Sequence, residues 1–274
     1  MIYNMKAYAK INIGLRIVKR KKNGYHILKS LMSLIDFYDE LIFEESDIIE
    51  VYTDPCICDE KDNLCYKVAV YMKQYAKTNK GIRIYIKKNI PTGGGLGGGS
   101  SNAACVLNFL NEYWCIRFSE KKLMKIAFMF GADIPFFVKG KQSFVSGYGE
   151  IVKPIKKVIN KDIILILPNF NLSTKEVFQK LDINKIKKRQ NKKLVFPDNI
   201  YNDMEQSANL ISGNKIEEIK EKVKKVGSGT VVMSGSGSTI VYYIDEQEEK
   251  SEVLEKIKEE LPECVVILSK IKQF

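Results

Sequence analysis

The sequence has a single histidine, His26, and none of its six cysteines forms a C-x-x-C pair. Structural zinc sites ordinarily combine paired cysteines with one another or with histidines. Cys56, Cys58 and Cys65 lie close together but far from His26, so they do not predict a metal site, and no metal ligand is firmly assigned. We expect reduced cysteines in a cytosolic protein.

Long apolar runs are also missing. No run approaches the roughly 20 residues that span a bilayer, and the N-terminus lacks the layout of a signal peptide. We therefore expect a cytoplasmic protein that has no membrane partner. The 274 residues suffice for one large domain or two of about half that size.

Aromatic residues are absent from the two most basic segments, 19–22 and 185–193, although the formal net charge is +11. Nucleic-acid binding usually combines basic patches with aromatic or polar readout groups. Solvated surface, or attraction of small polyanionic substrates, explains the charge better. We expect small-molecule partners and no nucleic acid.

The most distinctive segment present is a glycine loop. Six of the seven residues from Gly93 to Gly99 are glycine, and the loop joins a predicted strand (81–90) to a predicted helix (100–114). Ser100, Ser101 and Asn102 are good N-cap residues. Backbone N–H groups at a helix N-terminus, preceded by flexible glycines, are suited to binding phosphate. The pattern predicts a phosphate-binding loop.

Three common phosphate-binding motifs do not account for this loop. Gly93-x-Gly95-x-x-Gly98 matches the dinucleotide fingerprint in form, but the only acid near the required distance is Glu120, at a predicted helix start. No Gly-Lys-Ser/Thr follows the loop, which excludes a Walker A motif. His-Arg-Asp and Asp-Phe-Gly are missing, which excludes a protein kinase.

Three further positions carry candidate chemistry. Residues 6–18 alternate like a half-buried strand, which puts Lys10 and Asn12 on the side away from the core. From this strand alone, Lys10 is best interpreted as a surface lysine. Tyr25 and His26 follow an Asn-Gly turn, where a structural role is common. Asp133 follows a predicted helix among apolar residues, so it must be paired, hydrogen-bonded or functional, or it caps the next turn.

The remaining pattern predicts alternating helices and strands. A bend at Gly147-Tyr-Gly-Glu150 interrupts one strand, a capping box begins at Ser173, and the boundary between the two halves falls within 153–161. The other predicted strands are 27–37, 39–45, 48–53, 143–155, 162–168 and 264–271, with a strand–loop–strand unit at 229–244; the other predicted helices are 63–76, 119–130, 216–226 and 247–261.

In order and spacing, these segments resemble the GHMP kinase superfamily, named for galactokinase, homoserine kinase, mevalonate kinase and phosphomevalonate kinase. Three motifs carry the superfamily resemblance: the Lys10 strand, the loop from Pro91 to Ser101, and Met233-Ser-Gly-Ser-Gly-Ser-Thr239. Further motifs are closest to the kinases of a cytidine-diphosphate-linked methylerythritol: Ala9-Lys-Ile-Asn12, Asn23-Gly-Tyr-His26, Gly131-Ala-Asp-Ile-Pro-Phe-Phe137, Ser173-Thr-Lys-Glu-Val-Phe178 and Asn202-Asp-Met-Glu205.

The resemblance implies an α+β fold of two lobes with the active site in the cleft between them. The N-terminal ATP-binding lobe (1–155) is expected to resemble ribosomal protein S5 domain 2, and the C-terminal GHMP kinase lobe is 156–274. It implies ATP-dependent phosphorylation of the 2-hydroxyl of the methylerythritol substrate in non-mevalonate isoprenoid biosynthesis. Another GHMP kinase, or a nucleic-acid-binding protein with an S5-like lobe, remains an alternative.

The same resemblance implies roles for individual residues. Lys10 and Asp133 would be catalytic, and ATP would bind with Mg²⁺, to which Ser100 or Ser101 could contribute. Tyr25 and Phe178 would sandwich the cytosine. The ATP-binding residues would be Pro91, Thr92, Gly93, Gly94, Gly95, Leu96, Gly97, Gly98, Gly99, Ser100 and Ser101, and the other substrate-binding residues Asn12, His26 and Thr174. The protein would be a monomer or a weak homodimer.

Overall fold

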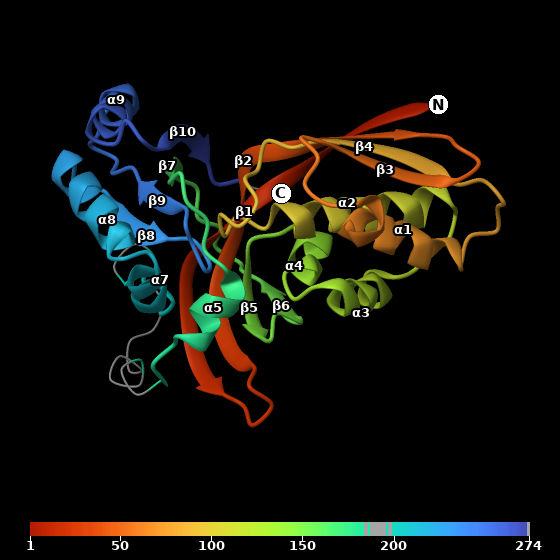
Figure 1. Ribbon diagram of the computed structural model, residues 1–274, viewed down its shortest axis with the longest axis horizontal. Coiled ribbons are helices and arrows are strands. Elements are labelled where there is room, and N and C mark those ends of the chain that lie inside the picture. Colours follow the sequence, from red (N-terminus) through yellow and green to blue (C-terminus); the bar gives the residue numbers. More distant parts are fainter. Residues whose placement is uncertain (184–185, 187–195, 197–198, 273–274) are drawn as a thin grey trace.

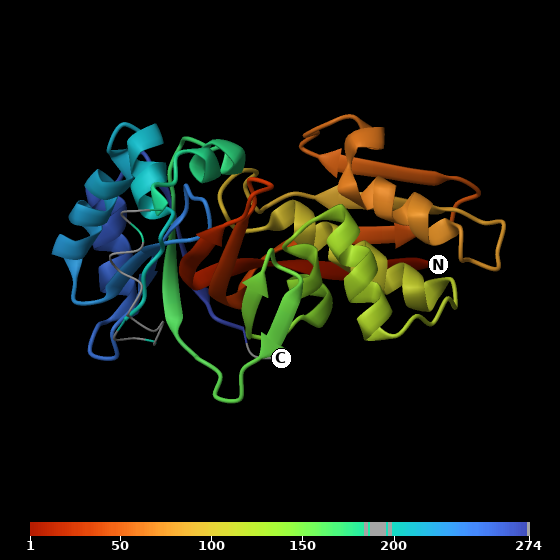
Figure 2. The ribbon, with the colours of Figure 1, turned by 90° about the horizontal axis from the view of Figure 1, so that it is seen from below.

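The computed structural model describes residues 1–183, 186, 196 and 199–272. The basic segment 185–193 lies outside these residues except for Ile186. Two β-sheets lie side by side, each covered by helices on one face (Figures 1 and 2). Among the described residues, no helix combines the length and apolarity needed to cross a bilayer.

The first sheet is built on a long hairpin, β1 (Ile2–Arg20) and β2 (His26–Glu44). The strand order is β3-β4-β2-β5-β6, and β1 pairs with β2 away from this path. Helices α1 to α4 cover one face of this sheet (Figure 1). The other elements are β3 (Ile49–Asp54), a 3₁₀ turn (Glu60–Asp62), α1 (Leu64–Lys73), β4 (Ile82–Lys87), α2 (Gly98–Tyr113), α3 (Glu120–Phe130), α4 (Ile134–Lys139), β5 (Ser143–Gly147) and β6 (Ile151–Pro154).

The second sheet has four antiparallel strands in the order β10-β7-β9-β8. Helices α7, α8 and α9 lie on its outer side (Figure 1). The elements are β7 (Asp162–Leu167), α5 (Thr174–Gln179), α7 (Glu205–Ile211), α8 (Lys215–Val226), β8 (Thr230–Met233), β9 (Ile240–Tyr243), α9 (Lys250–Glu260) and β10 (Val265–Lys270).

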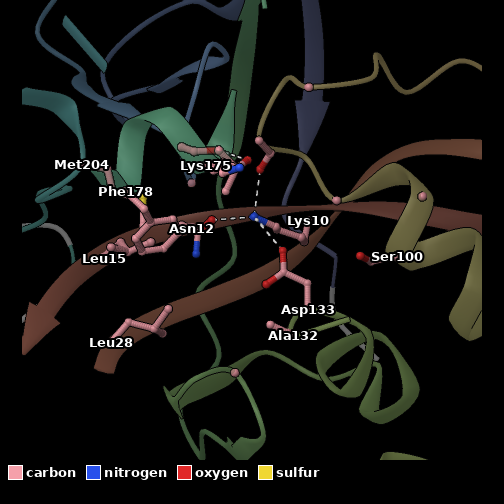
Figure 3. Close-up of a pocket in the computed structure, with 18 of the residues that line it drawn as sticks. Lys10, Asn12, Leu15, Leu28, Ser100, Ala132, Asp133, Lys175, Phe178 and Met204 are labelled. Carbon is pink, nitrogen blue, oxygen red and sulfur yellow. Dashed lines mark hydrogen bonds and ion pairs between the residues drawn. The ribbon is translucent and has the colours of Figure 1, made fainter. Parts of the chain in front are cut away.

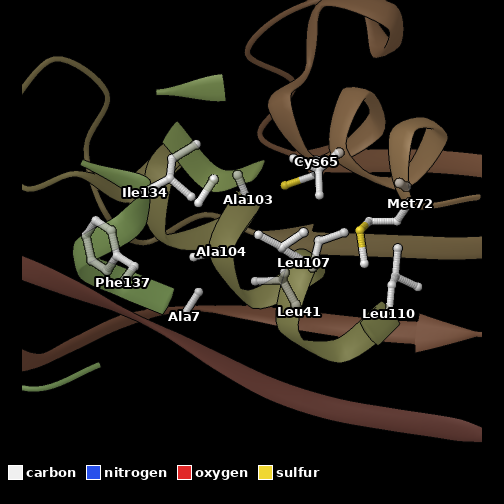
Figure 4. Close-up of a cluster of buried hydrophobic side chains, with 14 of the residues drawn as sticks. Ala7, Leu41, Cys65, Met72, Ala103, Ala104, Leu107, Leu110, Ile134 and Phe137 are labelled. Atoms are coloured by element: carbon white, nitrogen blue, oxygen red, sulfur yellow. The ribbon is translucent and has the colours of Figure 1, made fainter. Parts of the chain in front are cut away.

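Each lobe has its own apolar core. In the first lobe, Leu107 and Leu110 of α2 pack between Leu41 of β2 and Met72 of α1 (Figure 4). A third cluster joins the lobes, because Ile11 of β1 packs with residues of β7 and β9 such as Leu165. This shared core fixes the cleft between the sheets.

Most predicted elements are confirmed, with three differences. The strands 27–37 and 39–45 form one continuous strand, β2, in which Asp39 is fully buried. The segment 143–155 is a hairpin of β5 and β6 that turns at 147–150. Helix α2 begins at Gly98, with Gly97 in the left-handed region as its N-cap, so the predicted caps at 100–102 were wrong. The two sheets divide between Pro154 and Asp162, and a boundary at 155/156 stays a prediction.

Candidate active site

A cleft of about 1140 Å³ runs between the lobes. Its walls come from β1, the glycine loop, α5, the 147–150 turn and the 234–239 loop. Pockets for one small ligand usually measure about 300–1,000 Å³. The cleft therefore has room for two substrates, of which one would meet the glycine loop and the other the aromatic residues near the β1–β2 turn.

Glycine is required in this loop where the backbone approaches other atoms. Gly95 has a φ of +75°, and a Cβ there would lie 2.2 Å from the carbonyl oxygen of Ser234. Gly97 has a φ of +72°, and a Cβ there would lie 2.8 Å from the Phe137 ring. The loop delivers the N-terminus of α2 to the cleft, where N–H groups and the helix dipole favour an anion.

All residues from Pro91 to Ser100 except Leu96 line the cleft. The Leu96 side chain is buried in the core between the lobes. The hydroxyl of Ser101 is turned away and donates to the backbone oxygen of Tyr8 at 2.7 Å. Of the two serines that the sequence left open as Mg²⁺ ligands, Ser100 is the one that lines the cleft.

Lys10 and Asp133 meet in the middle of the cleft, although they are far apart in sequence. The Lys10 Nζ lies 3.7 Å from Asp133 Oδ2. Figure 3 shows this pair between Ser100 at one end and Phe178 and Met204 at the other. Burial lowers the pKa of the Lys10 ammonium, and the Asp133 carboxylate acts in the opposite direction.

Asp133 occupies the N-cap position of α4, yet its side chain makes no capping hydrogen bond. Its carboxylate is 42% exposed and points into the cleft toward Lys10 (Figure 3). The capping role that the sequence left open is therefore not what orients this acid. A partly exposed carboxylate beside a buried ammonium can accept or orient the proton of an incoming hydroxyl.

The prediction that Lys10 lies on the surface was wrong, because the second lobe covers β1. Lys10 and Asn12 are 3% and 4% exposed. The Lys10 Nζ donates to Asn12 Oδ1 at 2.7 Å and to the Gly95 oxygen at 2.8 Å. Asn12 Nδ2 in turn donates to Ser30 Oγ at 2.7 Å. Both ends of the Asn12 amide are thus engaged, and they hold the ammonium in place.

Register shifts in the β1–β2 ladder explain this arrangement. They fall between Tyr8 and Lys10 and again between Asn12 and Gly14, on either side of the two polar residues. Bulges redirect side chains and are common beside active sites.

Phe178 lies at the opposite end of the cleft from Ser100 (Figure 3). Tyr25, His26, Thr174 and Phe178 all line it. Tyr25 is 67% exposed at the hairpin tip. Phe178 stacks on His26, with ring centroids 5.3 Å apart, and Thr174 shares a 2.8 Å hydrogen bond with Ser236. A planar base between Tyr25 and Phe178 would therefore also lie next to the imidazole.

His26 carries an unsatisfied polar atom. Its Nε2 is buried and has no hydrogen-bond partner among the described residues. Burial lowers the pKa of His26, and the positive charge of Arg20 acts in the same direction. A neutral imidazole offers one donor and one acceptor, which suits the edge of a pyrimidine.

Sequence reasoning missed four residues that line the cleft: Arg20, Lys88, Tyr148 and Lys175. Arg20 belongs to the basic segment 19–22, for which attraction of polyanionic substrates was one open explanation. Tyr148 lies in the Gly147–Glu150 bend and Lys175 in the Ser173–Phe178 motif, but neither was assigned a role, and Lys88 lies in a segment with no distinguishing composition.

Lys88 belongs to a buried polar network behind the glycine loop. Its ammonium forms an ion pair with Asp39 and donates to Asn102 Oδ1 at 3.0 Å. Asp39 also accepts from the backbone N–H groups of Asn89 and Ile90 at 2.7 and 2.8 Å. These bonds fix the strand end from which the loop starts.

The side chains that could ligate a metal can be compared with the ligands that a divalent cation requires. Among residues 1–183, 186, 196 and 199–272, no group of three or more His, Cys, Asp or Glu side chains is arranged to hold a metal. Mg²⁺ typically keeps several waters and binds through phosphates and few protein ligands. The Ser100 hydroxyl and the Asp133 carboxylate are oxygen groups of the kind that fit a cation arriving with a nucleotide.

Comparison with known families agrees with this geometry. Residues 63–141 match the GHMP kinases N terminal domain, and residues 196–263 match the GHMP kinases C terminal domain. The chain is 35% identical over 256 residues to the 4-diphosphocytidyl-2-C-methyl-D-erythritol kinase of Clostridium perfringens (strain 13 / Type A), covering 88% of each chain. It is 38% identical over 250 residues to the enzyme of that name from Thermodesulfovibrio yellowstonii, covering 86% of this chain and 87% of that one.

The fold also matches a solved structure. A crystal structure of 4-(cytidine 5'-diphospho)-2C-methyl-D-erythritol kinase superposes with a TM-score of 0.81 at 24% identity, covering 99% of this chain and 100% of that one. At this identity the match shows the fold alone, which is the two-lobed α+β architecture that the sequence predicted.

Proposed function

Because this chain belongs to the GHMP kinase family, we propose that it transfers the γ-phosphoryl group of ATP to the 2-hydroxyl of 4-diphosphocytidyl-2-C-methyl-D-erythritol in isoprenoid biosynthesis. Its curated relatives at 35–38% identity carry the name of that kinase. The observation that carries the proposal is the Lys10–Asp133 pair, 3.7 Å apart, between a glycine loop and an aromatic wall.

The glycine loop would grip the triphosphate of ATP. Backbone N–H groups from Gly93 to Ser100, together with the dipole of α2, favour negative charge at this end of the cleft. Phosphoryl transfer depends mainly on positioning and on neutralising charge. A Mg²⁺ that arrives with ATP would neutralise the β- and γ-phosphates, and the Ser100 hydroxyl is the protein group best able to reach it.

Lys10 and Asp133 would act at the transferred group. Asp133 would accept or orient the proton of the attacking 2-hydroxyl, while the Lys10 ammonium would stabilise charge on the phosphoryl oxygens. Asn12 and the Gly95 carbonyl hold that ammonium at 2.7 and 2.8 Å. Asn12 would thus orient Lys10 as well as face the methylerythritol end.

The cytidine would occupy the aromatic end of the cleft. Tyr25 and Phe178 present flat rings to the base, and the unpartnered Nε2 of His26 offers a hydrogen bond to its edge. Arg20 and Lys175 supply positive charge for the substrate diphosphate. A sugar or amino-alcohol substrate would need none of these groups.

A substrate panel tests the proposal. The protein is incubated with ATP and Mg²⁺, and ADP release is measured with the cytidylyl substrate, homoserine, mevalonate and galactose in parallel. Turnover should occur with the cytidylyl substrate, and phosphorus NMR should place the new phosphate on the 2-hydroxyl. Turnover of another acceptor alone would contradict the proposal.

The aromatic sandwich is tested separately. Tyr25→Ala should raise KM for the cytidylyl substrate roughly 10-fold and leave KM for ATP within about two-fold, because the lost contact serves only the base. An unchanged KM for the cytidylyl substrate would contradict the sandwich.

We also propose that the protein acts as a monomer or weak homodimer whose partners are its small-molecule substrates. The cleft is formed by one chain. Light scattering after size-exclusion chromatography would measure the mass, and a tight larger assembly would contradict this proposal.

A further inference from the structure

The turn between β5 and β6 lines the cleft and makes two contacts there, one with Tyr25 and one with the backbone beside Asp133. Its sequence is Gly147-Tyr-Gly-Glu150, and the first and third residues have φ values of +79° and +129°. The Tyr148 N–H donates to Glu150 Oε2 at 2.6 Å. A Cβ on Gly147 would lie 2.3 Å from the Glu150 carboxylate. The Glu150 side chain therefore folds back over the turn and stabilises it through the Tyr148 N–H.

The first contact of this turn is with Tyr25. The Tyr148 and Tyr25 rings meet edge to face, with centroids 5.8 Å apart and an interplanar angle of 79°. Both residues line the cleft. Tyr25 is 67% exposed on a hairpin tip, so this ring contact limits where its side chain can lie.

The second contact is with the backbone beside Asp133. A Cβ on Gly149 would lie 2.2 Å from the carbonyl oxygen of Ala132, the residue before Asp133. The two backbone segments thus lie so close together that no Cβ fits between them at this point. Only a glycine permits this contact, and it sets the position of the peptide that carries the acid.

We propose that the 147–150 turn is a spacer that holds the Tyr25 side chain at a fixed distance from Asp133. Tyr148 is then the positioning residue for Tyr25. This inference rests on the proposed function, because it assigns the turn to the fit between a cytidylyl group and a hydroxyl that must reach Asp133. The two contacts act on different kinetic constants. Tyr148 governs how well the base is held, and Gly149 governs where the acid lies.

The first test removes the Tyr148 ring. Tyr148→Ala should raise KM for the cytidylyl substrate roughly 3- to 10-fold, the range expected for losing one aromatic pair, with kcat and KM for ATP changed by less than about two-fold. Tyr148→Phe keeps the ring and should restore a low KM. Tyr52→Ala, which deletes one ring of the exposed Tyr52–Tyr85 stack on β3 and β4, is the matched control for loss of an aromatic pair.

The second test fills the Gly149 contact. Gly149→Ala should lower kcat roughly 10-fold or more, because small displacements of a catalytic group are costly, and change KM for the cytidylyl substrate less than Tyr148→Ala does. If this variant does not fold, Glu150→Ala replaces it: it removes the acceptor for the Tyr148 N–H while keeping Gly149, so loosening the whole turn should lower kcat and also raise KM for the cytidylyl substrate.

Two results would overturn the spacer. One is a Tyr148→Ala variant whose KM matches that of Tyr52→Ala and wild type, or a Tyr148→Phe variant that fails to restore KM. The other is a folded Gly149→Ala or Glu150→Ala variant with unchanged kcat. Failure of the proposed function is distinct, because the wild-type protein would then not turn over the cytidylyl substrate at all.

Discussion

The two glycine-rich loops of this protein look alike in sequence but differ in the element that follows each loop and in how deeply their side chains are buried. The 91–101 loop opens onto the cleft and leads into a helix. The 234–239 loop leads into a strand, β9, and the side chains of Ser234, Ser238 and Thr239 are almost fully buried. Glycine content alone does not predict a phosphate site, whereas the element that follows the loop does, because a helix N-terminus supplies free N–H groups.

The second loop supports the first one. Ser234 Oγ accepts from the Asn12 N–H at 3.2 Å and donates to the Gly95 oxygen at 3.2 Å. That same Gly95 oxygen accepts from Lys10 Nζ. Asn202 holds the second loop by donating to the carbonyl oxygens of Met233 and Gly235. Both loops therefore converge on Lys10. Both also line the cleft, the second through Gly235 and Ser236, but only the second supports the other loop through Ser234.

The largest effect should come from the residues at this point of convergence. Lys10→Ala and Asp133→Ala should each lower kcat by roughly 10²–10⁴-fold, since each would remove a group that we propose acts on the reacting atoms. The fold should persist, as judged by circular dichroism and thermal melting. Near-normal turnover in either folded variant would contradict the catalytic assignment.

The second-largest effect should come from adding a side chain at the point where the two loops approach each other. Gly95→Ala should lower kcat/KM for ATP by roughly 100-fold, because its Cβ would collide with the Ser234 carbonyl and displace a loop that we propose positions the phosphates. Steady-state kinetics with varied ATP measures this.

Gly99→Ala is the matched variant for stability. A Cβ at Gly99 would meet nothing within 4 Å, and the residue is in the first turn of α2. Replacing a helical glycine by alanine should raise the free energy of unfolding by up to about 1 kcal/mol. If Gly95→Ala proved as stable and as active as Gly99→Ala, the close approach of the loops would have no functional role.

Sequence alone predicted much of this arrangement, for identifiable reasons. The glycine loop was recognisable because turn residues, a strand and a helix follow one another locally. The burial of Lys10 was not, because it depends on a lobe that begins about 150 residues later. The start of α2 was placed too late because Gly98 and Gly99 have poor intrinsic helix propensity, yet they form its first turn. The bend that contains Tyr148 was recognisable from its glycines, but its approach to the cleft was not, and Lys88 gives no local signal.

Two serines allow the difference between the loops to be measured directly. Ser234→Ala should lower the free energy of unfolding by about 1–3 kcal/mol, because it leaves the buried Asn12 N–H without its acceptor and removes one of the two donors to the Gly95 oxygen. Ser100→Ala should leave stability unchanged and raise KM for Mg·ATP roughly 3- to 10-fold, the loss of one hydrogen-bonding group. Denaturant unfolding and ATP kinetics on both variants form the test. If both variants changed stability and KM for Mg·ATP to the same extent, the assignment of Ser234 to stability and of Ser100 to ATP binding would be wrong.

The smallest effect is a shift in pH dependence. Burial lowers the pKa of Lys10 in the free protein, and the charged form is the one that we propose stabilises the phosphoryl group. Activity should therefore fall as pH rises through that lowered pKa, so kcat/KM should show an alkaline limb below the ordinary lysine value of about 10.5. Bound ATP adds negative charge beside the ammonium and raises its pKa, so the limb in kcat should lie at higher pH.

Lys10→Arg separates this ionisation from others, because a guanidinium stays charged throughout the accessible range. Its residual activity should show no alkaline limb below pH of about 10.5, while the wild-type limb persists under the same buffers. Circular dichroism at each pH controls for unfolding. An identical limb in both proteins would assign the titration to another group, and the convergence of the two loops on a buried, partly destabilised ammonium would then have no kinetic consequence.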